Sequence, residues 1–246
     1  MSAGAGRVVY GINPVREALR AKRARTLFLA EGVKAALALS GEARQAGAQV
    51  EQRPREELDA LAPGVPHQGA VALCGEFEYA ELEDLLARAP RPALVLVLDG
   101  IQDPGNLGAL VRSAHVLGAH GVIIPKDRSA EVTPAVVKTS AGATEHVPIA
   151  QVVNLSRALE QLKEAGLWVA GAVLGEDSQL PWEIDFSGPM ALVIGSEGKG
   201  IRPLVERHCD FRIRIPVLGL VSSLSAPAAG AALLYEAARQ RATERE

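Results

Sequence analysis

The second half of the chain alternates short, almost continuously apolar segments with helical patterns. The apolar segments include ALVLVLD at 93–99, GVIIP at 121–125 and ALVIG at 191–195. Strands that are apolar on both faces are typical of a parallel sheet covered by helices on both sides. The pattern therefore predicts an α/β fold with a mostly parallel sheet, in which ligands bind beyond the carboxyl ends of the strands.

Composition agrees with this class and limits the partners. Only 4% of the 246 residues are aromatic and 48% are hydrophobic, which favours close packing of helices on sheets in one large or two smaller domains. The net charge of −3 and the pI near 6.0 give no global attraction to a polyanion. Any contact with nucleic acid therefore requires a local basic patch.

The chain offers no signal for a metal, a disulfide or a membrane. Cys74 and Cys209 lie far apart without the paired spacing of a zinc site, so both are predicted to be buried thiols. The first residues lack the apolar core of a signal peptide, and no apolar run reaches the roughly 18 residues that a membrane span needs. We expect a cytoplasmic protein.

The first part of the chain predicts a separate small α/β domain. Asn13 and Pro14 predict the cap and first position of a helix, and further helix and strand patterns follow as far as Phe77. A charged, Ala-rich helical segment then ends in two prolines. We predict domains at 1–77 and 93–246, joined by a linker at 78–92.

Three Gly-containing polar loops follow apolar strands in the second half. In the first, Asp99 to Gly108, Asn106 lies where strand gives way to helix. Arg112 is six residues further on, close to two helical turns, so both side chains are expected to face one site. The alternative is a tight turn with Asn106 capping the helix and Arg112 solvated. The Gly spacing does not fit a dinucleotide fingerprint.

The second and third loops add a carboxylate and hydroxyls. In Gly195 to Gly200, the glycines let backbone amides approach a ligand, and Glu197 lies among them. A phosphate-binding loop is an alternative, although the Walker pattern is absent. In Pro216 to Ser225, the hydroxyls of Ser222, Ser223 and Ser225 precede a helix of small residues, which is also what a simple capped helix requires.

Taken in this order, the three loops resemble the SPOUT class of RNA methyltransferases, in particular the TrmH/RlmB family that methylates ribose 2′-hydroxyls. YGINPVREAL at 10–19, HQGAVA at 67–72 and the segment 125–148 are similar to that family as well. The resemblance implies a trefoil knot, which is an exception to the rule against threaded chains. It also implies S-adenosyl-L-methionine as cofactor, RNA as substrate, and a homodimer that completes the RNA site.

The resemblance assigns roles to eight residues by position. The implied catalytic residues are Asn106, Arg112, Glu197 and Ser223, and the implied cofactor contacts are Gly195, Ile215, Leu224 and Ser225. A ribose oxygen must attack the methyl group in line and lose a weakly acidic proton. Because a guanidinium stays protonated at pH 7, Arg112 is expected to grip the target phosphate and stabilise the developing alkoxide. No metal is implied.

The predicted N-terminal domain resembles the small RNA-binding domain of the family. Between Arg7 and Arg25 there are six Arg or Lys residues and one Glu, although a solvated helix face explains this bias too. His67 and Gln68 fit either a core position or an RNA contact. Lys126 to Arg128 fit either an RNA contact or a charged surface loop.

The third motif departs from the family. Where relatives usually read Ser-Leu-Asn-Val-Ser, this chain reads Ser223-Leu224-Ser225-Ala226-Pro227. A hydroxyl replaces only part of the hydrogen bonding of an amide. The first hypothesis is an enzyme that methylates a guanosine in 23S rRNA. The alternatives are a tRNA 2′-O-methyltransferase and a non-catalytic RNA-binding protein on the same fold.

Overall fold

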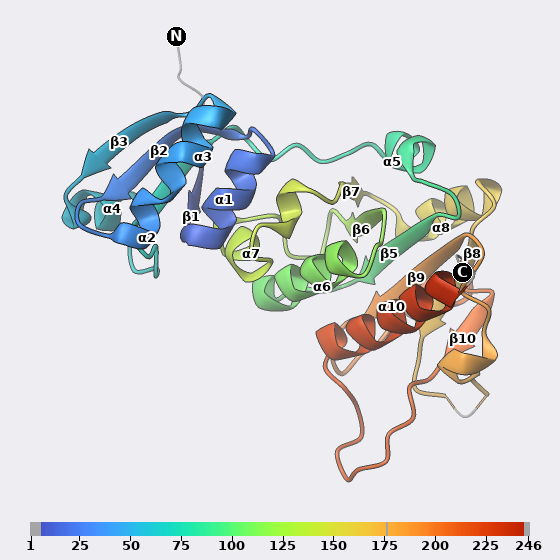
Figure 1. Ribbon diagram of the computed structural model, residues 1–246. Coiled ribbons are helices and arrows are strands. Elements are labelled where there is room, and N and C mark those ends of the chain that lie inside the picture. The colour runs from blue at the N-terminus through green and yellow to red at the C-terminus, as the bar shows by residue number, and fades with distance from the viewer. Residues whose placement is uncertain (1–5, 176, 244–246) are drawn as a thin grey trace. The chain divides into compact units, whose positions relative to one another are not determined.

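The chain forms two compact units in a computed structural model that describes residues 6–175 and 177–243 (Figure 1). One unit comprises the chain up to Glu78 together with Val132–His146, and the other comprises Tyr79–Glu131 with the chain from Val147 onward. The first residues of the predicted N-terminal domain, 1–5, lie outside the described residues. The predicted linker at 78–92 stays a prediction. The predicted domain 93–246 includes Val132–His146, which the structure groups with the N-terminal unit.

The N-terminal unit is a four-stranded sheet with helices. The strands lie in the order β1-β4-β2-β3, with β4 antiparallel to both β1 and β2, and β3 parallel to β2. Its elements are β1 (Arg7–Tyr10), α1 (Ile12–Arg20), β2 (Ala24–Ala30), α2 (Lys34–Leu37), α3 (Leu39–Ala46), β3 (Gln49–Arg53), α4 (Arg55–Leu61), β4 (Ala70–Cys74), α7 (Pro134–Thr139) and the 3₁₀ turn η1 (Ala143–Glu145).

Helix α1 begins earlier than the sequence predicts. Its N-cap is Gly11 at φ 91°, so the expectation that Asn13 caps the helix is wrong. The first amide, Ile12 N, donates instead to Gln68 Oε1 at 3.3 Å, from a loop 56 residues away. A side chain distant in sequence thus satisfies a helix terminus that local pattern rules assign to a neighbouring residue.

The segment from α7 to η1 is fastened to the N-terminal unit by polar contacts. The carboxylate of Glu145 receives both terminal nitrogens of Arg7 at 2.7 and 3.0 Å, and His146 Nε2 lies 2.7 Å from Glu17 Oε2. Lys138 Nζ donates to Gln68 Oε1 at 3.2 Å, and burial lowers the pKa of Lys138. One ion pair and two further polar contacts therefore attach this segment, which is remote along the chain, to the unit.

The C-terminal unit is built on a six-stranded sheet in the order β10-β8-β9-β5-β6-β7, and every strand pairing described is parallel. This confirms the predicted α/β class and sheet. Its elements are α5 (Leu82–Arg88), β5 (Leu94–Asp99), α6 (Pro104–Val116), β6 (Gly121–Pro125), β7 (Ile149–Val152), α8 (Leu155–Glu164), β8 (Trp168–Ala172), the 3₁₀ turn η2 (Pro181–Glu183), β9 (Met190–Gly195), α9 (Pro203–Glu206), β10 (Phe211–Ile213) and α10 (Ala226–Thr243).

Helices bury the strands of this sheet as the apolar runs require. All six residues of β5 and all five of β6 are buried. Helices α5, α8 and α9 contribute to one shared core with the sheet, whereas α10 packs on α6 and β9. Gly230 allows α10 to pack closely on α6, since a Cβ at this position would lie 2.4 Å from a methyl carbon of Leu110. Within the described part of the chain, no helix has the length and hydropathy for crossing a bilayer.

Candidate active site

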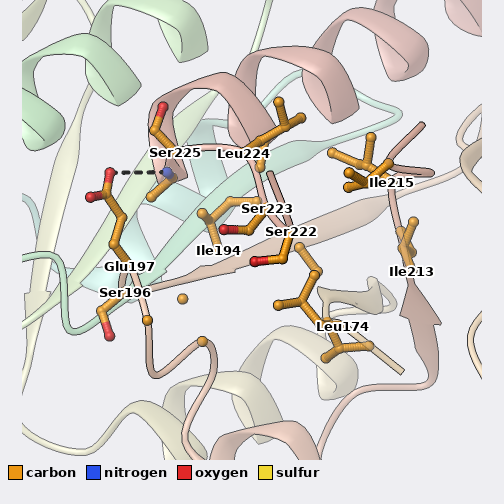
Figure 2. Close-up of a pocket in the computed structure, with 18 residues that line it drawn as sticks. Leu174, Ile194, Ser196, Glu197, Ile213, Ile215, Ser222, Ser223, Leu224 and Ser225 are labelled. Carbon is orange, nitrogen blue, oxygen red and sulfur yellow. Dashed lines mark hydrogen bonds between the residues drawn. The ribbon is translucent and has the colours of Figure 1, made fainter. Parts of the chain in front are cut away.

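A pocket of about 440 Å³ lies where β8, β9 and β10 end and α10 begins. This is the carboxyl edge of the parallel sheet, where such folds bind ligands. Figure 2 shows its side chains converging from several loops. The lining residues are Ala172, Val173, Leu174, Ile194, Gly195, Ser196, Glu197, Gly198, Gly200, Ile213, Ile215, Val217, Ser222, Ser223, Leu224, Ser225, Ala226 and Ala229.

The loop after β9 turns back tightly on itself. Ser196 and Gly200 exchange two backbone hydrogen bonds, at 3.1 Å from Ser196 N and 2.8 Å from Gly200 N. Gly195 is required at the crossing, because a Cβ there would lie 2.1 Å from the carbonyl carbon of Gly200. The tight turn presents Glu197 at its tip.

Glu197 connects the loop after β5 with the start of α10. Its Oε1 accepts from Asn106 Nδ2 at 3.1 Å and from the backbone amide of Ala226, at the start of α10, at 3.3 Å. Figure 2 shows the carboxylate turned toward that amide. Two donors on one oxygen fix the orientation of the carboxylate and leave Oε2 as a further acceptor.

The cap of α6 is Asp103, so the alternative in which Asn106 caps this helix is wrong. Asp103 Oδ1 accepts from the backbone amide of Asn106 at 2.7 Å, and Pro104 occupies the first turn. An aspartate cap followed by proline is a strong helix start. The side-chain amide of Asn106 is thereby available to Glu197.

Serine hydroxyls from the third loop divide between the pocket and the helix. Ser222, Ser223 and Ser225 all line the pocket, but Ser225 Oγ also accepts from the backbone amide of Ala228 at 3.4 Å. In Figure 2 the Ser225 hydroxyl points away from those of Ser222 and Ser223. Ser225 therefore acts as a helix cap, which the family's usual Asn would also do.

The four predicted cofactor contacts, Gly195, Ile215, Leu224 and Ser225, all line this one pocket, as do Glu197 and Ser223. Asn106 reaches it through Glu197. Sequence reasoning missed the main-chain contribution of Ala226 and the apolar wall supplied by Leu174. No residue pattern pointed to either, because both depend on how the loops pack.

Arg112 of α6 lies outside this pocket. It is exposed, and it is not among the described residues that line the pocket. Six residues at 3.6 per turn leave two side chains roughly 120° apart around the axis. Within one copy of the chain Arg112 does not line this pocket, and the expectation that it shares a site with Asn106 stays a prediction.

Comparisons with known proteins match both units. The SpoU rRNA methylase family matches residues 93–235, and the RNA 2′-O ribose methyltransferase substrate-binding family matches residues 8–80. The 23S rRNA (guanosine-2′-O-)-methyltransferase RlmB of Pseudomonas putida is 44% identical, over 96% of this chain and 98% of its own length.

Solved structures of methyltransferases superimpose on nearly the whole chain. The SpoU methyltransferase AviRb of Streptomyces viridochromogenes superimposes with a TM-score of 0.81 at 27% identity, covering 98% of this chain and 91% of its own. The AdoMet-bound rRNA methyltransferase of Sinorhizobium meliloti gives 0.79 at 25% identity, covering 96% and 87%. On the combined evidence of the sequence match over both units, the parallel-sheet fold and the pocket, this chain belongs to the SpoU rRNA methylase family.

Proposed function

We propose that the protein transfers a methyl group from S-adenosyl-L-methionine to the ribose 2′-hydroxyl of a guanosine in 23S rRNA. The observation that carries the proposal is that Gly195, Glu197, Ile215, Ser223 and Leu224 line one pocket at the carboxyl edge of the sheet. The RlmB relative, which is similar over nearly its full length, supports the substrate.

The pocket lining suits this cofactor. Leu174, Ile194, Ile213, Ile215 and Leu224 provide apolar contact for a flat ring system. The glycine-containing turn and the serine hydroxyls offer main-chain and side-chain hydrogen bonds to polar groups. A related AviRb structure is solved in complex with AdoMet, at 28% identity and a TM-score of 0.79.

The side chains around the pocket have different roles in the reaction. When bound, the cofactor supplies an electrophilic methyl group. Ser223 helps to place the ribose, and Glu197, held by Asn106 and Ala226, presents its second oxygen as an oriented acceptor. A guanidinium carries a positive charge at pH 7, so Arg112 grips the target phosphate and stabilises negative charge that develops on the ribose oxygen.

In a homodimer, Arg112 of one copy can reach the pocket of the other copy. Arg112 lies on an exposed stripe of α6 with Val116, which is 70% exposed, and α6 packs on α10, where Tyr235 is 62% exposed. The loop before α10, extended in Figure 1, exposes Leu218 and Leu220 almost fully. Apolar side chains gathered in this way are typical of an interaction surface. A second copy covering it would supply its own Arg112 to this pocket.

In this proposal the N-terminal unit, which matches the substrate-binding family, binds the RNA, and the protein acts in the cytoplasm. The basic bias between Arg7 and Arg25 is weaker in the structure than in the sequence. Four of its six cations form ion pairs with carboxylates, namely Arg7, Arg16, Arg20 and Arg23. Substrate recognition therefore depends on shape and hydrogen bonding as well as on charge.

A methyl-transfer assay tests the proposal. Radiolabelled methyl groups are followed onto 23S rRNA from a strain lacking the enzyme, with 16S rRNA and tRNA as competing substrates. We expect incorporation into a guanosine ribose of 23S rRNA, abolished in Arg112→Ala and retained in Arg157→Ala, an exposed arginine of α8. Transfer to tRNA alone would favour the tRNA alternative, and RNA binding without transfer would favour the non-catalytic one.

Mixing two inactive variants tests the shared site. If Arg112 serves the pocket of the other copy, a dimer of Arg112→Ala with Glu197→Gln contains one intact site, and activity returns on mixing. No recovery, although mixed dimers form, would contradict a site built from two copies.

A further inference from the structure

Asp99 is a fully buried carboxylate at the end of β5. Its side chain is 0% exposed, and it stands at the carboxyl edge of the sheet beside the pocket-forming loops. A buried charge is strongly unfavourable unless it is paired and hydrogen-bonded. Its partners therefore show which part of the structure depends on it.

Both carboxylate oxygens of Asp99 are used by one residue, Arg202. The backbone amide of Arg202 donates to Oδ2 at 2.7 Å, and Nε donates to Oδ1 at 2.7 Å. The two residues are 103 positions apart in sequence. Arg202 is 48% exposed and is the N-cap of α9. The result is a two-point clamp between the end of one strand and the start of one helix.

The clamp closes around the loop that carries Glu197. In the β5–β9 pairing, Asp99 stands opposite Gly195, the residue that opens the loop. Its side chain holds Arg202, which lies just beyond Gly200, the last residue of the tight turn. Asp99 thus fixes the entry of the loop through the sheet and its exit through the carboxylate.

We propose that Asp99 and Arg202 are positioning residues for methyl transfer, which hold Glu197 in register with Asn106 and Ala226. This inference rests on the proposed function. Arg202 acts through the loop, and neither residue has to touch the substrate. Misplacement of a reacting group by about 1 Å can lower a rate about 10²-fold, so a loosened loop is expected to lower kcat.

The chain contains a matched control for a merely structural ion pair. Asp210 accepts from the backbone amide of Val169 at 2.9 Å and pairs with Lys163 Nζ at 2.6 Å. This carboxylate also receives one backbone and one side-chain donor, and Lys163 is 38% exposed. It lies at the amino end of β8, on the sheet edge opposite the pocket.

The test compares Arg202→Gln, Arg202→Lys and Lys163→Gln in the full-length protein. Arg202→Gln keeps the backbone bond to Asp99 and loses the guanidinium. We expect its kcat to fall about 10²-fold with a smaller change in KM for the cofactor, and Arg202→Lys to recover part of the loss. Lys163→Gln should retain wild-type kcat. In a Glu197→Gln background, Arg202→Gln should cause little further loss.

Amide exchange provides a readout independent of catalysis. We expect faster exchange at Ser196 and Gly200 in Arg202→Gln and unchanged exchange there in Lys163→Gln. Unchanged loop exchange, or a wild-type kcat in Arg202→Gln, would overturn the inference. So would equal losses of kcat in Arg202→Gln and Lys163→Gln. If wild type transfers no methyl group, the proposed function fails, whereas the exchange data still decide whether the pair holds the loop.

Discussion

The side-chain amide of Asn106 donates to Glu197 Oε1 over 3.1 Å, although 91 residues separate the two in sequence. Glu197→Gln keeps the size of the side chain but replaces one acceptor oxygen by an NH₂ group. That donor can then face the Asn106 amide, which is also a donor. We expect methyl transfer to fall about 10²-fold, as when one oriented polar group is lost from an active site. Steady-state kinetics with saturating cofactor measures this.

The matched control is Glu164→Gln, an exposed carboxylate of α8, which should retain wild-type kcat. A Glu197→Gln variant with unaltered kcat would remove Glu197 from the proposed catalytic cluster.

The Arg7–Glu145 pair is nearly fully buried, with side chains 8% and 2% exposed. Removing one partner leaves an uncompensated buried charge, so Glu145→Ala is expected to destabilise the N-terminal unit by about 3–5 kcal/mol. The double change Arg7→Met with Glu145→Leu should cost less. Arg20→Ala, from an exposed pair, should change stability by about 0–1 kcal/mol.

Urea unfolding measures these differences, with circular dichroism as the signal. Tryptophan fluorescence is unsuitable, because both tryptophans, Trp168 and Trp182, lie in the C-terminal unit. An equal loss in the single and double variants would argue against an uncompensated charge as the cause.

Ser225 caps α10 through the amide of Ala228. Ser225→Ala should therefore lower stability by about 1 kcal/mol, whereas Ser225→Asn should retain it, because both residue types cap helices well. Thermal unfolding of the two variants beside wild type distinguishes capping from simple side-chain removal. Equal losses in Ala and Asn variants would show that the hydroxyl has another role.

Burial raises the pKa of Cys74 from 9.0 to about 11 and that of Cys209 from 9.0 to about 12. The neutral thiol is therefore favoured in the folded protein. This contribution to stability is complete below pH 9 and is lost as the pH rises through the folded-state pKa values. Alkylation at pH 8, followed by peptide mass spectrometry, should be slow in the native state and fast in denaturant. Equal native and denatured rates would contradict the assignment.

Much of the fold follows from local sequence. The apolar runs that become β5, β6 and β9 correctly predict that these strands are buried. Glycine and proline residues mark where the helices between them begin and end. Within the N-terminal unit, local rules failed at Asn13 because Gln68, brought in from another loop, caps the first turn of α1. Interactions between distant loops leave no local pattern.

The candidate site was predicted mostly by resemblance. Ile215 and Leu224 carry no chemical signal of their own, and their places in the pocket follow from family position. Six residues of helix place Arg112 roughly 120° from Asn106 around the axis, and its role in the site stays a prediction. Asp99 marked the start of a loop in the sequence, but only the structure links it to Arg202. The knot stays a prediction.

The segment Val132–His146 has a consequence for protein engineering. Val136 and Val137 are buried in a unit whose remaining residues all come from the start of the chain. A chimaera that exchanges only the first 78 residues with a relative would combine this segment with a foreign surface and would separate Arg7 from its cognate Glu145. Grafting the substrate-recognition module therefore means transplanting two pieces of sequence together.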